Sequence, residues 1–414
     1  MKKLLFAILA ASSLLFAESY QINTLSAKQM GMAHTGAGLK LGSESMHFNP
    51  GALGFLDKRL DVSGGVTFVI PEVQIDVQGD LTYNKHIGTP MFVYAASSIT
   101  DWLSAGISFT TPYGNAADYG KNWPGANLLQ SIDLKVFALQ PTIAFKFLDK
   151  ISIGGGPVIY FGNFELSKDL KNPALGLPAG IASMKLSGDS EVSVAANVGI
   201  LYDLLPNKLA LGIAYRSEAK MEVSDGKTKV SSAISNPMFS AFNAAKFKTE
   251  LPMPANLNTG ISFSPIEKLI LAFDWQMMFW GTYEELVFTF DNPALPVTKS
   301  KKNFDNTFAY RLGAQYTLIP QLDLRLGVYL DETPVPDDYL TPESPSTNKF
   351  GSSIGFSFRP IPNWSIDASF LYSNGSGYFG RDAKSGSNAE KDDGLDARYE
   401  VQAWLPSIGM SFSF

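Results

Sequence analysis

LDLRLGVYL, at residues 322–330, is the stretch that decides the fold class of this chain. Every second residue is aliphatic, and the residues between them are Asp323, Arg325, Gly327 and Tyr329. Successive side chains of a β-strand point to opposite faces, so one face of this stretch is apolar and the other is largely polar. The stretch therefore predicts an amphipathic β-strand.

The same alternation recurs at residues 192–200, 269–279 and 354–358. Strands of soluble sandwiches also alternate, but they are shorter and lack the aromatic residues near strand ends that are typical of bilayer interfaces. Such aromatic residues occur here as Trp102, Tyr202, Tyr215, Trp280, Tyr316, Trp364, Tyr372 and Trp404. The pattern favours strands that cross a bilayer.

Turn signals separate fifteen candidate strands, at 59–70, 72–79, 88–99, 102–111, 130–147, 150–166, 186–203, 208–222, 249–264, 267–288, 303–318, 321–332, 349–359, 363–373 and 398–414. Single-chain bacterial barrels have even strand numbers, so one of these boundaries is wrong. The weakest boundary is at Pro71, where no polar turn intervenes. Merging 59–79 into one bent strand predicts an all-β fold, a 14-stranded antiparallel transmembrane β-barrel over residues 58–414.

The connections between these strands fall into two lengths that alternate along the chain. Short connections are expected to be periplasmic turns, and they lie at 98–101, 148–150, 204–208, 264–268, 319–321 and 360–363. Long connections are expected to be external loops, and they lie at 112–129, 167–185, 223–248, 289–302, 333–348 and 374–397.

One long segment, residues 26–53, has five glycines and no alternation, and it contains the turn signal Asn49-Pro50-Gly51. A barrel of about 14 strands is wider than an ~8-stranded barrel filled by its own side chains and narrower than an open ~16-stranded porin. We therefore expect residues 18–57 to form an N-terminal hatch inside the barrel. Tyr20, Ile22, Asn49 and Pro50 belong to it, although Asn49-Pro50 also fits the end of a short helix.

The chain begins MKKLLFAILAASSLLFAES, in which Lys2 and Lys3 precede an apolar run at 4–16. This order is typical of an export signal, and the run is shorter than the ~20 residues that a spanning helix needs. We expect a signal peptide over residues 1–17, with cleavage after Ala17 or Ser19, and export to the bacterial outer membrane.

Composition excludes several classes of chemistry. The chain has no cysteine, so disulfides, thiolate zinc sites and cysteine nucleophiles are ruled out. The net charge of -6 is spread without a basic block, which argues against a nucleic-acid partner. His34 and His47 lack acidic neighbours at ligand spacing, so we expect no metal site and no cofactor. A barrel lipase would have to recruit His86, because no histidine follows it.

Short motifs follow one another along the chain: Gly31-Met32-Ala33, Asn49-Pro50, Pro112-Tyr113-Gly114, Trp123-Pro124-Gly125, LGIAYRS at 211–217, LPMPA at 251–255, WGTYEEL at 280–286, YRLGAQY at 310–316, LRLGV at 324–328 and DETPVPD at 331–337. In this order they resemble the FadL/TodX family of outer-membrane transporters for long-chain fatty acids and aromatic hydrocarbons, nearly end to end. The resemblance implies a fourteen-stranded barrel with a hatch. It also implies that substrate passes through a hydrophobic pocket and leaves sideways through a gap in the wall.

The chain departs from the family at positions that bear on charge. Glu343 stands where the family usually has an arginine after Thr341-Pro342, and a later Asp-Arg pair of the family appears as Asn348-Lys349. The end of the strand at 150–166 offers Asn163 and no basic residue. These departures reduce the positive character expected at a carboxylate-binding site.

Two external loops carry more apolar residues than solvent exposure favours, which is typical of a binding groove. The candidate groove residues are Trp123, Leu128, Leu129, Leu170, Leu175, Leu177 and Ile181. The alternative is that these residues only pack the two loops together.

Ser108, Pro112 and Gly114 are the candidates for a lateral gap. Proline has no N–H to give to a strand ladder, and glycine permits a sharp bend beside it. We expect residues 108–114 to bend inward, with Asn49-Pro50 of the hatch beside the gap. The alternative is a strand that simply ends at Pro112.

Arg311, Arg325 and Arg359 lie opposite the apolar faces of their strands and are expected to point into the lumen. There they form ion pairs with Asp274, Asp323 and Asp367, or bind a substrate carboxylate.

The expected function is a passive outer-membrane channel for hydrophobic small molecules, with a general porin for polar solutes as the alternative and no enzymatic activity. Its partners are the substrate, outer-membrane lipid and the barrel-assembly machinery, which reads the terminal Phe414, although Phe414 also fits a plain last strand. The chain is expected to be a monomer.

Overall fold

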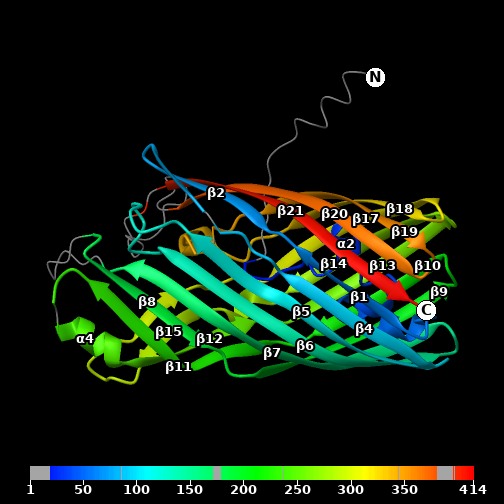
Figure 1. Ribbon diagram of the computed structural model, residues 1–414, viewed down its shortest axis with the longest axis horizontal. Helices are drawn as coiled ribbons and strands as arrows, with labels where there is room; N and C mark the ends of the chain where they lie inside the picture. Colours follow the sequence, from blue (N-terminus) through cyan, green and yellow to red (C-terminus); the bar gives the residue numbers. More distant parts are fainter. Residues whose placement is uncertain are drawn as a thin grey trace, which may run out of the picture.

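The computed structural model describes residues 19–84, 86–170, 179–235, 237–343, 345–379, 395 and 397–414. The described strands form one closed antiparallel barrel of fourteen strands (Figure 1). The predicted all-β, 14-stranded fold is therefore confirmed. The predicted signal peptide, residues 1–17, lies outside the described residues.

The strands run in chain order as β1 Asp61–Thr67, β2 Ile70–Val77, β3 Asp80–Tyr83, β4 Met91–Thr100, β5 Leu103–Asp118, β6 Ser131–Phe147, β7 Ile151–Asp169, β8 Ala182–Asp189, β9 Ser193–Leu205, β10 Leu209–Arg216, β11 Ala219–Ser232, β12 Lys246–Met253, β13 Asn256–Ile266, β14 Leu269–Met278, β15 Glu285–Phe290, β16 Thr298–Lys301, β17 Thr307–Ile319, β18 Leu322–Asp331, β19 Lys349–Ile361, β20 Trp364–Phe379 and β21 Ala397–Ser413. The helices are α2 Ala27–Met30, η1 Gly42–Glu44, α3 Ser45–Phe48, η2 Pro50–Phe55, α4 Pro237–Ala244, η4 Trp280–Thr282 and η5 Asp337–Tyr339. Among the described residues, no helix is long and apolar enough to cross a membrane.

Several strands of the wall are each built from two consecutive pieces, namely β1 with β2, β8 with β9, β10 with β11, β12 with β13, and β14 with β15. The short strands β3 and β16 extend β2 and β15 as hairpins. The ring closes where β1 pairs with β21, from Asp61 opposite Ser413 to Thr67 opposite Ser407. The other edge of β1 pairs with β4. Closure removes the free edges that an open sheet would present.

The stretch 322–330 forms β18, as its alternation predicts. Leu324, Leu326 and Leu330 are 41%, 61% and 43% exposed on the outer surface, whereas Asp323 and Arg325 are 1% and 5% exposed inside. The apolar face therefore points outward, to where the bilayer supplies an apolar solvent. The polar face points into the lumen, where side chains can hydrogen-bond to one another.

Strand boundaries differ from the prediction mainly on the side of the long loops. The merged first strand is interrupted at residues 68–69, and Pro71 lies within β2, where it faces Ala403 of β21. β3 pairs only with the later part of β2, from Gln74 onward, so no ladder bond on that side requires an N–H from Pro71. Regions predicted as loops, such as 223–248, contain the end of β11 and helix α4.

The N-terminal segment, residues 19–57, contacts strands that lie far apart along the ring, among them β7, β9, β13 and β19. Helix α2 begins at Ser26, whose side chain accepts a hydrogen bond from the N–H of Gln29. Gly38 faces Gly260 of β13 so closely that a Cβ on Gly38 would lie 2.8 Å from the Gly260 backbone. Backbone-to-backbone contact of this kind lets an irregular segment pack against a strand wall.

Candidate functional site

The pairing of β5 with both of its neighbours changes near Pro112. Pairing between β4 and β5 runs from Leu103 to Thr110, and the register between β5 and β6 shifts between Thr110 and Tyr113. Pro112 lies in this shift and has no N–H to restore the ladder. Among the described residues, β4 forms no ladder pair with β5 beyond Thr110.

The N-terminal segment pairs with β5 from inside the barrel at this interruption. The N–H of Ile22 donates to the carbonyl of Pro112 at 2.8 Å, and the N–H of Gly114 donates to the carbonyl of Tyr20 at 2.9 Å. Gln21 and Tyr113 form an isolated antiparallel bridge between these two bonds. Tyr20 and Ile22, predicted as hatch residues, therefore contact the predicted gap directly.

These bonds correct two expectations about the gap. The strand does not end at Pro112, because β5 continues to Asp118 by pairing with β6. Ser108 lies in intact wall, because it faces Tyr94 of β4 and Gln140 of β6. The interruption begins after Thr110 and not at Ser108, since proline removes a donor only at its own position.

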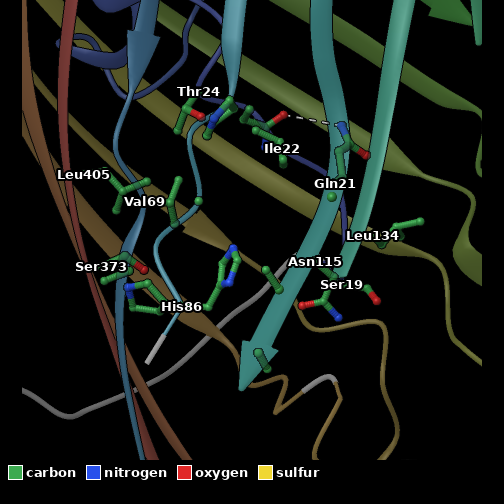
Figure 2. A pocket seen from close by; sticks show the side chains of 18 of the residues that line it. Ser19, Gln21, Ile22, Thr24, Val69, His86, Asn115, Leu134, Ser373 and Leu405 are labelled. Carbon is green, nitrogen blue, oxygen red and sulfur yellow. Dashed lines mark hydrogen bonds between the residues drawn. The ribbon is translucent and has the colours of Figure 1, made fainter. Parts of the chain in front are cut away.

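A cavity of about 620 Å³ lies behind the interruption (Figure 2). Figure 2 shows Ser19, Gln21, Ile22 and Thr24 of the N-terminal segment lining it together with Leu405 and Ser373 of the wall. Asn84 and residues 86–90 also line it, and the Asn84 side chain donates to the carbonyl of Ala116 at 3.3 Å. The volume falls within the ~300–1,000 Å³ of small-molecule sites.

A second cavity of about 60 Å³ adjoins the first, and the two share Ser19, Asn115, Leu134 and Glu343 as lining residues. Most of its other lining side chains are apolar, and they are Tyr20, Ile132, Phe164, Leu166, Met221, Val223, Leu251, Tyr283, Leu286, Phe288 and Phe304. Of the described residues that line it, only Lys302 and Glu343 carry charge. We refer to the two spaces as the large cavity and the apolar cavity.

Lys302 and Glu343 form an ion pair, with 2.5 Å between Nζ and Oε1. Burial alone would raise the pKa of Glu343, but the charge and hydrogen bond of Lys302 outweigh burial, so the pKa lies below its ordinary value. Glu343 is therefore a carboxylate at neutral pH. Sequence reasoning singled out Glu343 but missed Lys302, which follows a short hairpin strand and carries no motif.

The described members of the predicted external groove are buried or half-buried side chains of the two loops. Trp123 Nε1 donates to the carbonyl of Leu129 at 2.6 Å, and both side chains are buried. Leu128 and Leu170 are half-buried against the same cluster, and Ile181 is half-buried on the second loop. Leu175 and Leu177 lie outside the described residues. None of the five described members lines the large or the apolar cavity.

Asn49 anchors the N-terminal segment away from the interruption. Its Nδ2 donates to the carbonyl of Ala37 at 2.7 Å and to that of Ile200 on β9 at 3.0 Å, and its Oδ1 accepts from the N–H of Gly51 at 2.9 Å. The Pro50 carbonyl packs against Gly154 of β7. The expectation that Asn49-Pro50 lies beside the gap is wrong, because these bonds hold it against β7 and β9.

The three lumen arginines point inward and form ion pairs with acidic residues, one of which lies outside the predicted set. Arg325 and Arg359 both contact Asp323, as expected. Arg311 pairs with Asp331 at 3.3 Å. Asp274, one of the three acidic residues predicted to neutralise the arginines, also accepts the N–H groups of Gly36 and Ala37 at 2.6 and 2.8 Å, because the segment brings those donors to the wall.

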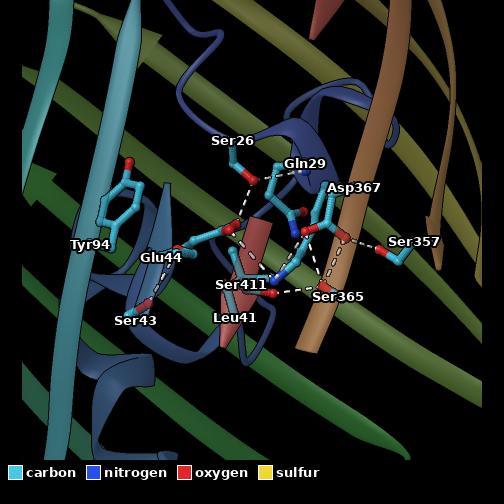
Figure 3. A network of polar contacts seen from close by, with 12 residues as sticks. Ser26, Gln29, Leu41, Ser43, Glu44, Tyr94, Ser357, Ser365, Asp367 and Ser411 are labelled. Carbon is cyan, nitrogen blue, oxygen red and sulfur yellow. Dashed lines mark hydrogen bonds and ion pairs between the residues drawn. The ribbon is translucent and has the colours of Figure 1, made fainter. Parts of the chain in front are cut away.

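A polar network fastens α2 to the wall and was missed by sequence reasoning (Figure 3). Ser26 Oγ donates to Glu44 at 2.5 Å, and Lys28 lies 3.6 Å from Glu44 and 3.9 Å from Asp367 of β20. Burial raises the pKa of Glu44, although Lys28 and Ser26 oppose that rise. Burial alone would lower the pKa of Lys28, but Glu44 and Asp367 together raise it, so Lys28 is a cation.

No cluster of three or more metal-binding side chains occurs in the described parts of the chain. His47 contacts Arg216 at 3.1 Å, and burial followed by the charge of Arg216 holds the pKa of His47 well below its ordinary value.

Comparison with known proteins places these features in a wider group. The family model described as "Outer membrane protein transport protein (OMPP1/FadL/TodX)" matches residues 8–414. A long-chain fatty acid transport protein of Escherichia coli O6:H1 is 22% identical over 404 residues, which cover 89% of this chain and 90% of the relative. A 47 kDa outer membrane protein of Pasteurella multocida is 23% identical over 435 residues, which cover 99% of this chain and 96% of that protein.

Solved structures share the fold at low sequence identity. A Pseudomonas aeruginosa FadL homologue superposes with a TM-score of 0.83 at 18% identity, covering 96% of this chain and 100% of that one. The toluene transporter TodX of Pseudomonas putida gives a TM-score of 0.73 at 14% identity, covering 97% and 99%. At these identities the structural likeness shows the fold alone.

Proposed function

The chain belongs to the OMPP1/FadL/TodX family of outer membrane transport proteins, and from that premise we propose that it takes up hydrophobic small molecules across the outer membrane. One observation carries the proposal. The large cavity is lined by Thr111 and Gly114 of β5, next to the shift in its pairing, and adjoins the apolar cavity. A binding space next to a stretch of β5 that no longer pairs with β4 is an arrangement that passage between lumen and bilayer requires.

The proposed path has three stages. Substrate first leaves water in the external groove around Trp123, Leu128, Leu129, Leu170, Leu175, Leu177 and Ile181. It then moves through the apolar cavity into the large cavity, past Leu134, which lines both. It leaves sideways between Pro112, Gly114 and residues 86–90.

Sideways release is favoured by the solvation of the substrate. Each buried CH₂ is worth about 0.8 kcal/mol, so a hydrocarbon that stepped into the watery periplasm would lose several kcal/mol. Entering the bilayer through the wall avoids that loss. The hatch, residues 18–57, then closes the straight route, and its contacts through Asn49 and Lys28 hold it in place.

Filling the junction between the cavities tests the path. Leu134→Trp places a larger side chain at a position that lines both cavities and is 4% exposed. We expect uptake of dilute toluene, by bacteria that lack other channels of this family, to fall about tenfold, because a filled pocket cannot bind. The matched control is Leu326→Trp on the lipid-facing surface, which should transport normally.

Heat-modifiable gel mobility would verify that both variants fold. If folded Leu134→Trp protein transports as well as the control, substrate does not pass between the two cavities. Liposome swelling with sugars tests the alternative of a general porin, for which swelling should be rapid. With the N-terminal segment packed across the lumen, we expect little swelling.

Two further proposals concern assembly. Phe414 is exposed at the end of β21, and its backbone pairs with Leu60 at 2.9 Å in both directions, so its ring is free for the barrel-assembly machinery to contact. The barrel is closed by its own first and last strands, so a monomer suffices to complete the wall.

A further inference from the structure

Among the described residues that line the apolar cavity, Lys302 is the one basic side chain, and Glu343 forms an ion pair with it. The side chain of Lys302 is 3% exposed, that of Glu343 is 21% exposed, and Nζ and Oε1 lie 2.5 Å apart. Both residues are also held through the backbone. The N–H of Lys302 donates to the carbonyl of Glu284 at 2.7 Å, and Asn115 Nδ2 donates to the carbonyl of Glu343 at 2.6 Å.

We propose that Glu343 is a specificity-determining residue, which makes this cavity accept uncharged ligands and reject carboxylates. The proposal rests on the proposed function and names the charge class of its substrate. A buried ammonium alone would attract a ligand carboxylate through a charge-assisted hydrogen bond. With Glu343 in place, such a ligand has to approach a like charge or displace Glu343 and leave that carboxylate without its partner.

The rest of the cavity suits an apolar ligand. Phe164 and Phe288 lie 6.2 Å apart between ring centroids, and Tyr283 and Phe304 lie 4.9 Å apart at 75°. Aromatic walls of this kind bind rings and chains by area and by edge-to-face contacts. Since this cavity holds only about 60 Å³, it receives one end of a ligand whose remainder extends into the large cavity.

A different role for the ion pair makes a different prediction. If Lys302 only ties down the loop that carries Glu343, removing the charge of Glu343 should affect stability and leave ligand preference unchanged. Lys168 on β7 also lies within the electrostatic reach of Glu343, but it does not line the cavity. Lys168 therefore tests whether a change of charge near Glu343 but outside the cavity affects ligand binding.

The test compares toluene with benzoate, which share a ring and differ in charge, as ligands of the full-length protein in lipid nanodiscs. At about pH 8 benzoate is fully ionised. We expect wild type to bind toluene at least about tenfold more tightly than benzoate. The reason is that Glu343 occupies Lys302, so benzoate cannot form a charge-assisted hydrogen bond with that lysine. Glu343→Gln keeps an oxygen that accepts from Lys302 but removes the charge. It should tighten benzoate binding about tenfold and leave toluene binding nearly unchanged.

Two variants complete the design. Lys302→Met combined with Glu343→Gln should abolish the gain in benzoate binding, because it removes the cation. Lys168→Met should bind both ligands as wild type does. The proposal is overturned if wild type binds benzoate as tightly as toluene. It is equally overturned if folded Glu343→Gln protein keeps the wild-type ratio of affinities.

Uptake separates this proposal from the proposed function. If cells still take up toluene while Glu343→Gln leaves the affinity ratio unchanged, only the role of Glu343 fails. If wild type binds neither ligand and supports no uptake of toluene, both proposals fail.

Discussion

His34 is a histidine held neutral inside the barrel. Burial, together with the nearby charge of Arg311, lowers the pKa of His34 to about 3. Its Nδ1 has no hydrogen-bond partner in the part of the chain that the structure describes. Because the folded pKa is depressed, His34 supports the docked segment fully above its unfolded pKa of 6.5, and that support is lost as the pH falls toward 3.

Acidification should therefore loosen the N-terminal segment. We expect ion conductance in planar bilayers to rise between about pH 7 and pH 4.5, because a charged imidazole is costly at a buried site. In His34→Phe the rise should be smaller, since phenylalanine keeps a ring near Tyr329 and cannot be protonated. His86→Phe is the matched control and should behave as wild type. An identical pH profile in all three proteins would contradict this role of His34.

At the scale of elements, the N-terminal segment and the wall meet backbone to backbone. Gly260 of β13 faces Gly38, and a Cβ at Gly260 would lie 2.5 Å from the Gly38 nitrogen and 2.4 Å from Asp274 Oδ1. Asp274 is the residue that accepts the N–H groups of Gly36 and Ala37. The close approach and these two hydrogen bonds therefore both depend on the absence of a side chain at Gly260.

Gly260→Ala should detach this part of the segment without unfolding the barrel. Overpacking typically costs about 1–3 kcal/mol, which is enough to weaken local docking but not to open a closed ring of strands. We expect faster hydrogen exchange at residues 36–38 and unchanged heat-modifiable mobility. Gly88→Ala is the control, because its Cβ would meet Val69 at an ordinary 3.5 Å. Unaltered exchange at 36–38 in the Gly260 variant would show that the wall gives way instead.

At the scale of the whole molecule, the N-terminal segment and the barrel depend on each other unequally. The barrel is closed by pairing of β1 with β21, which does not involve the segment. The segment instead depends on the wall for its contacts. Asn49 and Lys28 of the segment bind wall residues, and residues 20–22 pair with β5.

Deleting residues 20–53 should therefore leave a folded barrel with an open lumen. We expect its conductance in planar bilayers to exceed that of the intact protein about tenfold or more, since a barrel of this size encloses space that its wall side chains do not fill. Heat-modifiable mobility checks the fold of the variant. Equal conductance of the two proteins would remove the assignment of the segment as a plug.

The fold class could be predicted from sequence because its signal is local. Alternation at residues 322–330 sets which side chains of β18 face lipid, whatever strands lie beside it. The merging of residues 59–79 into one strand also rested on a local feature, the missing polar turn at Pro71. The lack of alternation at residues 26–53 likewise indicated that this segment is not a wall strand.

Contacts across the lumen were decided only by tertiary structure. Arg311 pairs with Asp331 while Asp274 binds the segment, and Asn49 lies against β9 while Tyr20 and Ile22 meet the interruption of β5. The apolar cavity likewise combines Lys302 and Glu343 from two separate loops. Periodicity fixes which face of a strand a residue occupies. Which inward-facing residues meet depends on how the ring closes and on where an irregular segment finds donors, and neither is encoded at neighbouring positions.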